Sequence, residues 1–478
     1  MFSIRRILCL PDEDAPHKTK TQTEILTHFM ETSTTHGLGN IYHAKKILNR
    51  LFWILAFLAF FSVLIYQIYV LGVKFNSHAH VTRVYNEVQD NGIQFPAVTI
   101  CNANPFPIEK ITATLYTLYP NVTNWTDSVY QEKIEDFKLQ ALNFNLTQLS
   151  SLGVAPENLF IANRCFFANK ACSYPSDFRL YSSANDGNCF TFNQNGSHRQ
   201  HRPGVKYGLS VTLNINQSSY STHLISKNIF PVGAYISIHE AGKLVDFTSR
   251  AILVAPNQLS RISVKKKSIQ RLKDPYRDNC TDALSDTVSS AVGGYTVDTC
   301  LLSCYVQKLF DYCQVVDVPS AVGWSNILGI RLPPARTQKD MSCLNKFDSI
   351  YIEGKVKCHC NAPCYEDSYE KSVSTAAWPT IVESDEYIQA LKQENNITLT
   401  RDYIMNNFLS VQVYYDDFTI EKTVHAPEFD NNKLFSELGG LLGLWIGASF
   451  FSLIEFGGMI WQVITNYLAK KKNKETKK

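Results

Sequence analysis

The segment Leu434–Ile464 constrains the fold of this chain most, because it is apolar enough to enter a lipid bilayer yet contains six glycines. It reads LFSELGGLLGLWIGASFFSLIEFGGMIWQVI and carries two carboxylates, Glu437 and Glu455. A single helix of this length would extend about 46 Å, whereas the hydrocarbon core of a bilayer is about 30 Å thick. The segment is therefore expected to tilt, to overrun the membrane or to break.

Small and polar residues recur along this segment at helical spacing. Three glycines lie four residues apart, which lets helix backbones approach closely: Gly439, Gly443 and Gly447. Ser449, Ser452 and Glu455 then follow three residues apart and form a polar stripe. A carboxylate inside a membrane is costly unless it faces water or a partner. We interpret the segment as the wall of a cation pore; a plain membrane anchor with packing glycines is the alternative.

A second apolar run, Leu51–Gly72, contains no charged residue and has the length of one transmembrane helix. A cleaved signal peptide is the weaker alternative, because fifty residues precede the run and no small-residue cleavage site follows it closely. Basic residues flank its start, and a lysine-rich tail follows the C-terminal segment. By the positive-inside rule both flanks are cytoplasmic. We predict a plasma-membrane protein with two spans in the lipid bilayer and both termini in the cytoplasm.

Cysteines and glycosylation sequons test this topology independently. Twelve of the 13 cysteines lie between the two apolar runs, and only Cys9 lies outside them. An even set confined to one segment indicates disulfides in an oxidising compartment. All seven Asn-x-Ser/Thr sequons lie in the same region, as acceptor sites of an extracellular domain do: Asn121, Asn124, Asn145, Asn195, Asn216, Asn279 and Asn396.

The region between the runs mixes strand and helix patterns without a βαβ period, which predicts an α+β ectodomain with an antiparallel β core. Strands are expected at 95–101, 207–215, 233–239, 261–264 and 409–415, and helices at 108–118, 130–142, 299–312 and 386–393. The predicted organisation is a cytoplasmic N-terminus (1–50), a first transmembrane helix (51–73), an extracellular ligand-sensing domain (74–432), a second transmembrane helix with the pore (433–465) and a cytoplasmic tail (466–478).

One cysteine cluster permits a geometric prediction. Cys300 and Cys304 lie four apart in a helical pattern, a rise of about 6 Å, and Cys358 and Cys360 lie two apart, about 6.6 Å on a strand. The two pairs can form rungs between a helix and a strand, but spacing leaves the connectivity open. A zinc site around Cys358–Cys364 is the alternative, disfavoured because thiols pair in an oxidising compartment. His78, His80 and the histidines of 198–202 are interpreted as exposed polar residues, with proton or metal sensing as the alternative.

The sequence offers no enzyme chemistry. It has no G-x-S-x-G, H-E-x-x-H, Walker or dinucleotide motif, and nothing places its serines and histidines together. The net charge of +3 is too small to suggest nucleic-acid binding. We therefore predict no catalytic residues, no metal and no cofactor. A two-span receptor or adhesion protein without a pore remains the alternative to a channel.

Four strings together resemble the degenerin/epithelial sodium channel family. Thr35–Leu38 (THGL) is similar to its His-Gly motif, Phe95–Asn102 (FPAVTICN) to a signature after the first span, and Gly187–Asn193 (GNCFTFN) to its Gly-x-Cys-Tyr-Thr-Phe-Asn segment. Gly447-Ala448-Ser449 matches its Gly/Ser-x-Ser selectivity tripeptide. The resemblance extends from about residue 30 to residue 465. ATP-gated purinergic channels share the two-span plan but lack these strings.

The resemblance implies a homo- or heterotrimer of family subunits with a hand-like ectodomain of palm, β-ball, knuckle, finger and thumb. It implies a sodium-permeable pore that amiloride blocks. It also implies six disulfides: Cys101–Cys189, Cys165–Cys172, Cys280–Cys364, Cys300–Cys360, Cys304–Cys358 and Cys313–Cys343.

The pore residues follow from the same resemblance. Gly447, Ala448 and Ser449 would form the selectivity filter, where carbonyl and hydroxyl oxygens replace part of an ion's hydration shell. Glu455 would form an inner ring of charge and Glu437 an outer one. Acid-sensing members carry a further acidic residue three positions after the glutamate that corresponds to Glu455. Gly458 occupies that position here, which leaves open whether the pore prefers sodium or calcium.

Gating residues and the stimulus are also implied by resemblance. His36 and Gly37 look like the re-entrant element that supports the lower pore, and Ser436 lies near the small-residue site where bulky substitutions hold family channels open. The stretch Val373–Pro379 (VSTAAWP) is similar to one found in peptide-gated, epithelial and degenerin members. It favours an extracellular neuropeptide ligand of the RFamide type; proton gating and constitutive or mechanical gating are the alternatives.

Overall fold

The computed structural model describes residues 21–141, 146–183, 186–220, 231–243, 250–282, 294–316, 332–395 and 398–475. The chain forms two compact units. One unit consists of Thr82–Ala426, and the other combines the residues up to Val81 with those from Pro427 onward. The predicted cytoplasmic and membrane segments fall in the second of these units.

The larger sheet of the Thr82–Ala426 unit is organised around the long strand β12 (Gln258–Gln270). β13 (Tyr365–Ala377) pairs with β12 in antiparallel register along its whole length. On the other edge of β12 lie β14 (Phe408–Tyr415) and β15 (Thr419–Pro427), both parallel to it. The predicted antiparallel core is therefore correct for the other pairs but not for these two, which make the sheet mixed. Parallel pairing requires a long crossover, and the residues between β12 and β14 form one whose described part contains four helices and β13.

The order of this sheet is β1-β15-β12-β14-β9-β4-β5, with β13 also on β12. Its other strands are β1 (His80–Val88), β4 (Phe160–Phe167), β5 (Lys170–Ala171) and β9 (Leu209–Asn214). A second sheet has the order β11-β10-β3-β7-β6. Its strands are β3 (Ala97–Asn102), β6 (Phe178–Ser183), β7 (Gly187–Phe192), β10 (Ala234–His239) and β11 (Ile252–Val254). A short ladder joins β2 (Ile93–Gln94) to β8 (Arg199–Gln200).

Aromatic side chains fill the core of the two larger sheets. Phe95 is 1% exposed and makes edge-to-face contacts with Phe167, Phe192 and Tyr415. Every residue of β3 and β7 is buried, so these strands lie inside the unit and not at its surface. Two of the strings that carried the family resemblance, 95–102 and 187–193, are therefore core strands.

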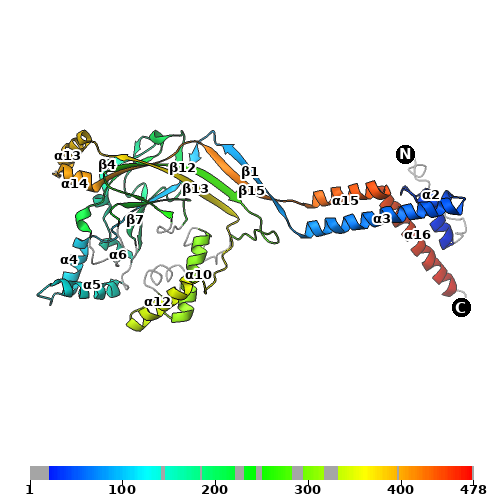
Figure 1. Cartoon of the computed structure of the whole chain (residues 1–478), viewed down its shortest axis with the longest axis horizontal. Coiled ribbons are helices and arrows are strands. Elements are labelled where there is room, and N and C mark those ends of the chain that lie inside the picture. Colours follow the sequence, from blue (N-terminus) through cyan, green and yellow to red (C-terminus); the bar gives the residue numbers. More distant parts are fainter. Residues whose placement is uncertain are drawn as a thin grey trace, which may run out of the picture. The chain divides into compact units, whose positions relative to one another are not determined.

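Helices lie at one end and along one side of the sheets in three groups (Figure 1). The first contains α4 (Ile108–Leu118), α5 (Asp127–Ala141), α6 (Leu146–Leu152) and α7 (Pro156–Leu159). The second contains α10 (Val297–Cys313) and α12 (Gln338–Ile352), which pack through Val306, Leu309, Leu344 and Phe347. The third contains α13 (Ile381–Asn395) and α14 (Arg401–Asn407). Short 3-10 turns occur at η2 (Val205–Tyr207) and η3 (Gln217–Ser219).

Six disulfides cross-link the Thr82–Ala426 unit, and they join the same cysteines that the resemblance paired: Cys101–Cys189, Cys165–Cys172, Cys280–Cys364, Cys300–Cys360, Cys304–Cys358 and Cys313–Cys343. Cys300 and Cys304 lie on α10 as expected. Cys358 and Cys360 precede β13 in irregular backbone, so the expected strand there was wrong. Because all three cysteines of the Cys358–Cys364 patch are oxidised, the zinc alternative is wrong as well.

The described part of the other unit contains the helices α1 (Gln22–Thr32), α2 (Leu38–His43), α3 (Ile47–Asn76), α15 (Asn431–Ile446) and α16 (Phe450–Glu475). Among the described residues, α3 alone is long and apolar enough to cross a membrane as a single helix. α15 and α16 pass the same test only as one broken span, bent by 75°. Of the three outcomes expected for Leu434–Ile464, the structure therefore has the break, and Figure 1 shows α15 running alongside α3 before α16 turns away.

Candidate functional site

The break between α15 and α16 falls on Gly447, Ala448 and Ser449, the tripeptide singled out in the sequence. Gly447 has a φ of +62°, in the left-handed region that favours glycine. The Gly447 N–H donates to the Gly443 carbonyl and the Ala448 N–H donates to the Leu442 carbonyl, both at 3.1 Å, so two of the last carbonyls of α15 are satisfied around the left-handed residue. α15 thus ends because its last turn is capped, and the three residues that follow are non-helical.

The N-terminal segment docks at this break. The His36 N–H donates to the Ile446 carbonyl at 2.9 Å, which satisfies one of the free carbonyls at the end of α15. A Cβ added to Gly447 would lie 2.1 Å from the His36 ring. Gly37, with a φ of +91°, begins α2 and turns the chain back toward α3. The structure therefore brings together His36, Gly37 and Gly447, which the sequence predicted separately.

Three side chains continue this contact into α16. The Thr34 N–H and hydroxyl both donate to Glu455 Oε2, at 3.0 and 3.2 Å. Thr34 Oγ1 also lies 2.7 Å from Ser452 Oγ, and Ser452 Oγ accepts the Ser449 N–H at 3.0 Å. Glu455, expected as an inner ring of charge, is thus also a hydrogen-bond acceptor for the N-terminal segment. Sequence reasoning missed Thr34, because its contacts are far away in the sequence and no motif marks it.

α15 is held against α3 on one face and is open on another. The Trp445 indole N–H donates to Gln67 Oε1 at 2.7 Å, and the Trp445 ring lies 6.0 Å from that of Phe60. Apart from the neighbouring backbone of α15 itself, no atom of the described residues lies within 4 Å of a Cβ built at three glycines: Gly439, Gly440 and Gly443. Glu437 and Ser436 lie on α15 one turn before them. The small-residue face of α15 therefore has room for another helix or for water.

Lysine–carboxylate pairs line β12, β13 and β15 in the Thr82–Ala426 unit. Lys267 lies 3.1 Å from Glu370 and 3.4 Å from Glu421, and Lys266 lies 2.6 Å from Asp367. The hydrogen bond from Lys422 lowers the pKa of Glu87 below its ordinary value. Pairing of this kind favours the ionised carboxylate, so Glu87 resists protonation on mild acidification.

Two titratable groups at the end of β10 differ from this pattern. Burial lowers the pKa of His239 to about 4, and its Nε2 lies 2.9 Å from the Thr99 hydroxyl. Burial also raises the pKa of Glu240, with Asp367 adding to the shift and Lys243 and Lys266 opposing it. On acidification Glu240, with its raised pKa, takes up a proton earlier than an ordinary glutamate, whereas the lowered pKa of His239 keeps this histidine neutral in mild acid.

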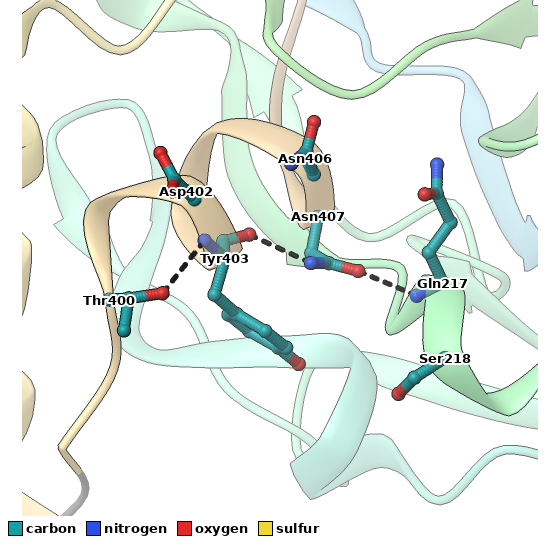
Figure 2. A pocket seen from close by; sticks show the side chains of 7 residues that line it. All are labelled: Gln217, Ser218, Thr400, Asp402, Tyr403, Asn406 and Asn407. Atoms are coloured by element: carbon teal, nitrogen blue, oxygen red, sulfur yellow. Dashed lines mark hydrogen bonds between the residues drawn. The ribbon is translucent and has the colours of Figure 1, made fainter.

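A polar pocket of about 470 Å³ lies between η3 and α14 (Figure 2). Its lining contains one carboxylate, and the other groups are amides, hydroxyls and a phenol: Gln217, Ser218, Thr400, Asp402, Tyr403, Asn406 and Asn407. Asn407 of α14 connects the pocket's two walls, because its Oδ1 accepts the N–H of Gln217 in η3 at 2.6 Å. Its amide N–H donates to the Tyr403 carbonyl within α14. Such a lining suits a ligand that donates hydrogen bonds or carries positive charge.

The stretch Val373–Pro379, which suggested the stimulus, has a structural role. Val373–Ala377 completes β13, and the Trp378 ring packs edge-to-face against Tyr387 at 5.7 Å. The Trp378 indole N–H donates to Glu383 Oε1. These contacts belong to the aromatic cluster under α13 and α14, which also contains Tyr403 of the pocket.

The remaining predicted residues are distributed over the surface. Asn121, Asn124, Asn195 and Asn279 are exposed and Asn216 is partly buried, whereas Asn145, Asn396 and Cys9 lie outside the described residues. Of the histidines interpreted as exposed, His201 is exposed, whereas His78, His80 and His198 are partly buried. The His198 ring packs against Phe167 and Phe192.

Comparison with known proteins identifies the family. A family profile described as "Amiloride-sensitive sodium channel" matches residues 29–458. Degenerin-like protein asic-2 of Caenorhabditis elegans is 26% identical over 479 residues, which cover 91% of this chain and 86% of that protein. Acid-sensing ion channel 1 of Gallus gallus is 25% identical over 470 residues, covering 93% and 85%. The FMRFamide-activated amiloride-sensitive sodium channel of Cornu aspersum is 23% identical over 527 residues, covering 91% and 82%. The chain therefore belongs to the amiloride-sensitive sodium channel family of degenerins and epithelial sodium channels, oligomeric ion channels of the plasma membrane and not enzymes, as its motifs predicted.

Proposed function

We propose that this chain is one subunit of a trimeric channel in which α3 and the broken α15–α16 pair are the two membrane spans. Three copies of Gly447–Ser449 would form the narrowest part of a sodium-selective pore. The observation that carries this proposal is the 75° break at these three residues. Non-helical backbone at membrane depth is tolerated where it lines a water-filled path, and it exposes oxygens that can replace part of an ion's water shell.

Contacts within the helical unit support the proposed topology. α1 lies against α16, with the Phe29 and Phe456 rings 5.7 Å apart, and the segment after α1 binds Ile446 and Glu455. The segment that precedes α3 and the segment that follows the break therefore lie at the same end of the helical unit. This arrangement supports placing both termini on the cytoplasmic side, where the positive-inside rule also puts them. The open glycine face of α15 supports a neighbouring subunit or the pore water beside it.

Replacing Ser449 with alanine is the direct test of this pore. Loss of one hydroxyl ligand per subunit is expected to lower the sodium-to-potassium permeability ratio about fivefold, since a hydrogen bond contributes about 1 kcal/mol. The measurement is the reversal potential of the amiloride-sensitive current in oocytes under bi-ionic conditions. Calcium permeation is read from the same recordings.

Ser62→Ala is the matched control, because the Ser62 hydroxyl donates to the Leu58 carbonyl of its own helix. An unchanged reversal potential in Ser449→Ala would contradict the filter. A chain that reaches the surface but stays silent with every stimulus and sister subunit would favour the receptor or adhesion alternative.

We also propose that an extracellular cationic, amidated peptide opens the channel. One relative is named as an FMRFamide-activated channel, and the pocket between η3 and α14 offers Asp402 and several amides to such a ligand. The pKa of Glu87 is lowered by its pairing with Lys422, and the pKa of His239 is lowered to about 4 by burial, so mild acidification protonates neither group. Glu240, whose pKa burial raises, is the group through which the proton-gated alternative would act.

An Arg-Phe-amide peptide is expected to evoke current at constant pH 7.4, and an acid step alone is not. Asp402→Asn should raise the half-activating peptide concentration about fivefold, since it removes one exposed charge-assisted hydrogen bond. Glu353→Gln, an exposed carboxylate paired with Lys355 on a different part of the unit, is the control. Current evoked by acid without peptide, and abolished by Glu240→Gln, would instead establish proton gating.

A further inference from the structure

The glycosylation sequon at Asn216 lies directly beside the pocket between η3 and α14. Its three residues are Asn216, Gln217 and Ser218, and the last two line the pocket. Figure 2 shows Gln217 and Ser218 on one side of the pocket and the α14 residues on the other. Asn216 is partly buried and immediately precedes η3. A sugar attached to this asparagine therefore starts at the edge of the pocket.

The Asn216 side chain is held through its carbonyl oxygen. Asn216 Oδ1 accepts the Ser218 hydroxyl at 2.8 Å, and the Tyr403 phenol also approaches it, at 3.4 Å. The amide nitrogen, which is the atom that receives the sugar, has no hydrogen-bond partner among the described residues. The backbone of Asn216 is left-handed, with a φ of +48°, which asparagine adopts more readily than most residues. A glycan on the nitrogen therefore leaves both oxygen contacts and the turn in place.

A sugar tethered at this position competes with any free ligand for the mouth of the pocket. A group linked beside its site acts at an effective concentration of about a millimolar, so even weak contacts keep it there. The lining offers amides, hydroxyls and the carboxylate of Asp402, all of which can hydrogen-bond to sugar hydroxyls. A large ligand must first displace the glycan, and association is slower when binding requires such a rearrangement.

We infer that Asn216 carries an N-linked glycan and that this glycan restricts access to the pocket between η3 and α14 by the size of the ligand. Short peptides pass beside the sugars and reach Asp402, whereas long or folded ligands do not. The consequence for peptide gating rests on the proposed function of the pocket. The modification and the shielding of Asp402 do not rest on it.

Mass spectrometry of the full-length chain, isolated from surface membranes, determines whether Asn216 is modified. Peptide-N-glycosidase acting on the denatured protein converts a glycosylated asparagine into aspartate. This conversion is expected at position 216. The inference is overturned if Asn216 stays an unmodified asparagine in the surface population.

Cysteine labelling on intact cells measures the shielding without any current. Asp402→Cys in a Cys9→Ser background provides a single free thiol, because the other twelve cysteines form the six disulfides. The probes are a small impermeant maleimide and the same maleimide on a long polyethylene glycol chain. Destroying the sequon is expected to speed the large reagent about tenfold and the small one less than about twofold, since only the large one must displace the glycan.

Ser218→Ala and Ser218→Thr are the matched pair for this experiment. Both change the same pocket residue, but alanine destroys the sequon and threonine keeps it. The large reagent is expected to react fast in the alanine variant and slowly in the threonine variant. Asn121→Gln removes a sequon between α4 and α5, none of whose residues lines the pocket, and should leave labelling slow. Equal rates in the alanine and threonine variants contradict the shielding.

An enzymatic arm avoids any change at the pocket. Cells are grown so that they make only high-mannose glycans, and endoglycosidase H then trims each glycan to its first sugar. Trimming is expected to speed the large reagent when the Asn216 sequon is intact and to have no effect in Ser218→Ala. The same acceleration in both would assign the shielding to another glycan and overturn the inference.

An Arg-Phe-amide peptide fused at its N-terminus to a small folded protein tests the consequence for gating, in chains that keep Asp402. The half-activating concentration of this fusion is expected to be about tenfold lower in Ser218→Ala than in Ser218→Thr, which corresponds to about 1.4 kcal/mol. The free peptide should act equally on both variants. Silence with both ligands, together with size-dependent labelling, would refute the proposed peptide gating alone. Labelling that ignores the sequon, together with peptide-evoked current, would refute this inference alone.

Discussion

Replacing Gly447 with alanine is expected to abolish sodium-selective current while the chain still reaches the cell surface. Two costs combine at this position. Alanine in the left-handed region costs about 1–2 kcal/mol, and its Cβ would lie 2.1 Å from Nδ1 and 2.4 Å from Cγ of His36. The ring cannot retreat freely, because the His36 backbone is tied to the Ile446 carbonyl. The break must therefore change shape in every subunit of the channel.

The measurement is whole-cell current with bi-ionic reversal potentials, alongside surface labelling. Gly72→Ala is the matched control, since a Cβ at that α3 glycine has no atom of the described residues within 4 Å apart from the neighbouring backbone of α3. Adding His36→Ala to Gly447→Ala separates the two costs: partial recovery of current would assign the defect to the ring clash, and no recovery to the backbone conformation. Normal selectivity in Gly447→Ala would refute the tight contact between the N-terminal segment and the break.

The sequence predicted the parts of this site that depend on local pattern. Leu434–Ile464 was too long for a straight span, and the break occurs at the glycine where the resemblance placed the selectivity tripeptide. Helix periodicity located 108–118 to the residue, because α4 buries Ile111 and Leu115 at a four-residue spacing. Four of the five expected strands match β3, β9, β10 and β14 within a few residues, and the fifth falls inside β12.

Long-range contacts were beyond such reasoning. Thr34 and Glu455 are 421 residues apart, and neither residue type at its position predicts the other. The parallel pairing of β12 with β14 and β15 depends on a crossover whose path no local pattern encodes. β13 was missed because its sequence, YEDSYEKSVSTAA, is mostly polar and has no alternating apolar pattern. Its pairing partner, and not its own hydrophobicity, makes it a strand.

The same polar strand provides the largest expected effect on the stability of the Thr82–Ala426 unit. Lys266 on β12 and Asp367 on β13 form an ion pair at 2.6 Å, and their side chains are only 11% and 9% exposed. Asp367 also accepts hydrogen bonds from Ser268 and Tyr365. Removing one member of a buried ion pair leaves an uncompensated charge and costs about 3–5 kcal/mol.

Lys266→Met is therefore expected to lower the thermal stability of the detergent-solubilised channel sharply, as followed by fluorescence size-exclusion chromatography after heating. Lys265→Met is the matched control on the neighbouring residue. Lys265 lies 3.7 Å from Asp417, and the two side chains are 53% and 47% exposed. Loss of this surface pair is therefore expected to lower the free energy of unfolding by at most about 1 kcal/mol. Combining Lys266→Met with Asp367→Leu removes both charges and should recover most of the loss, because an apolar pair can replace a buried ion pair without penalty. If the Lys266→Met and Lys265→Met variants lose structure at the same temperature, the Lys266–Asp367 pair is solvated in the assembled channel. The position of β13 then depends on its backbone hydrogen bonds to β12.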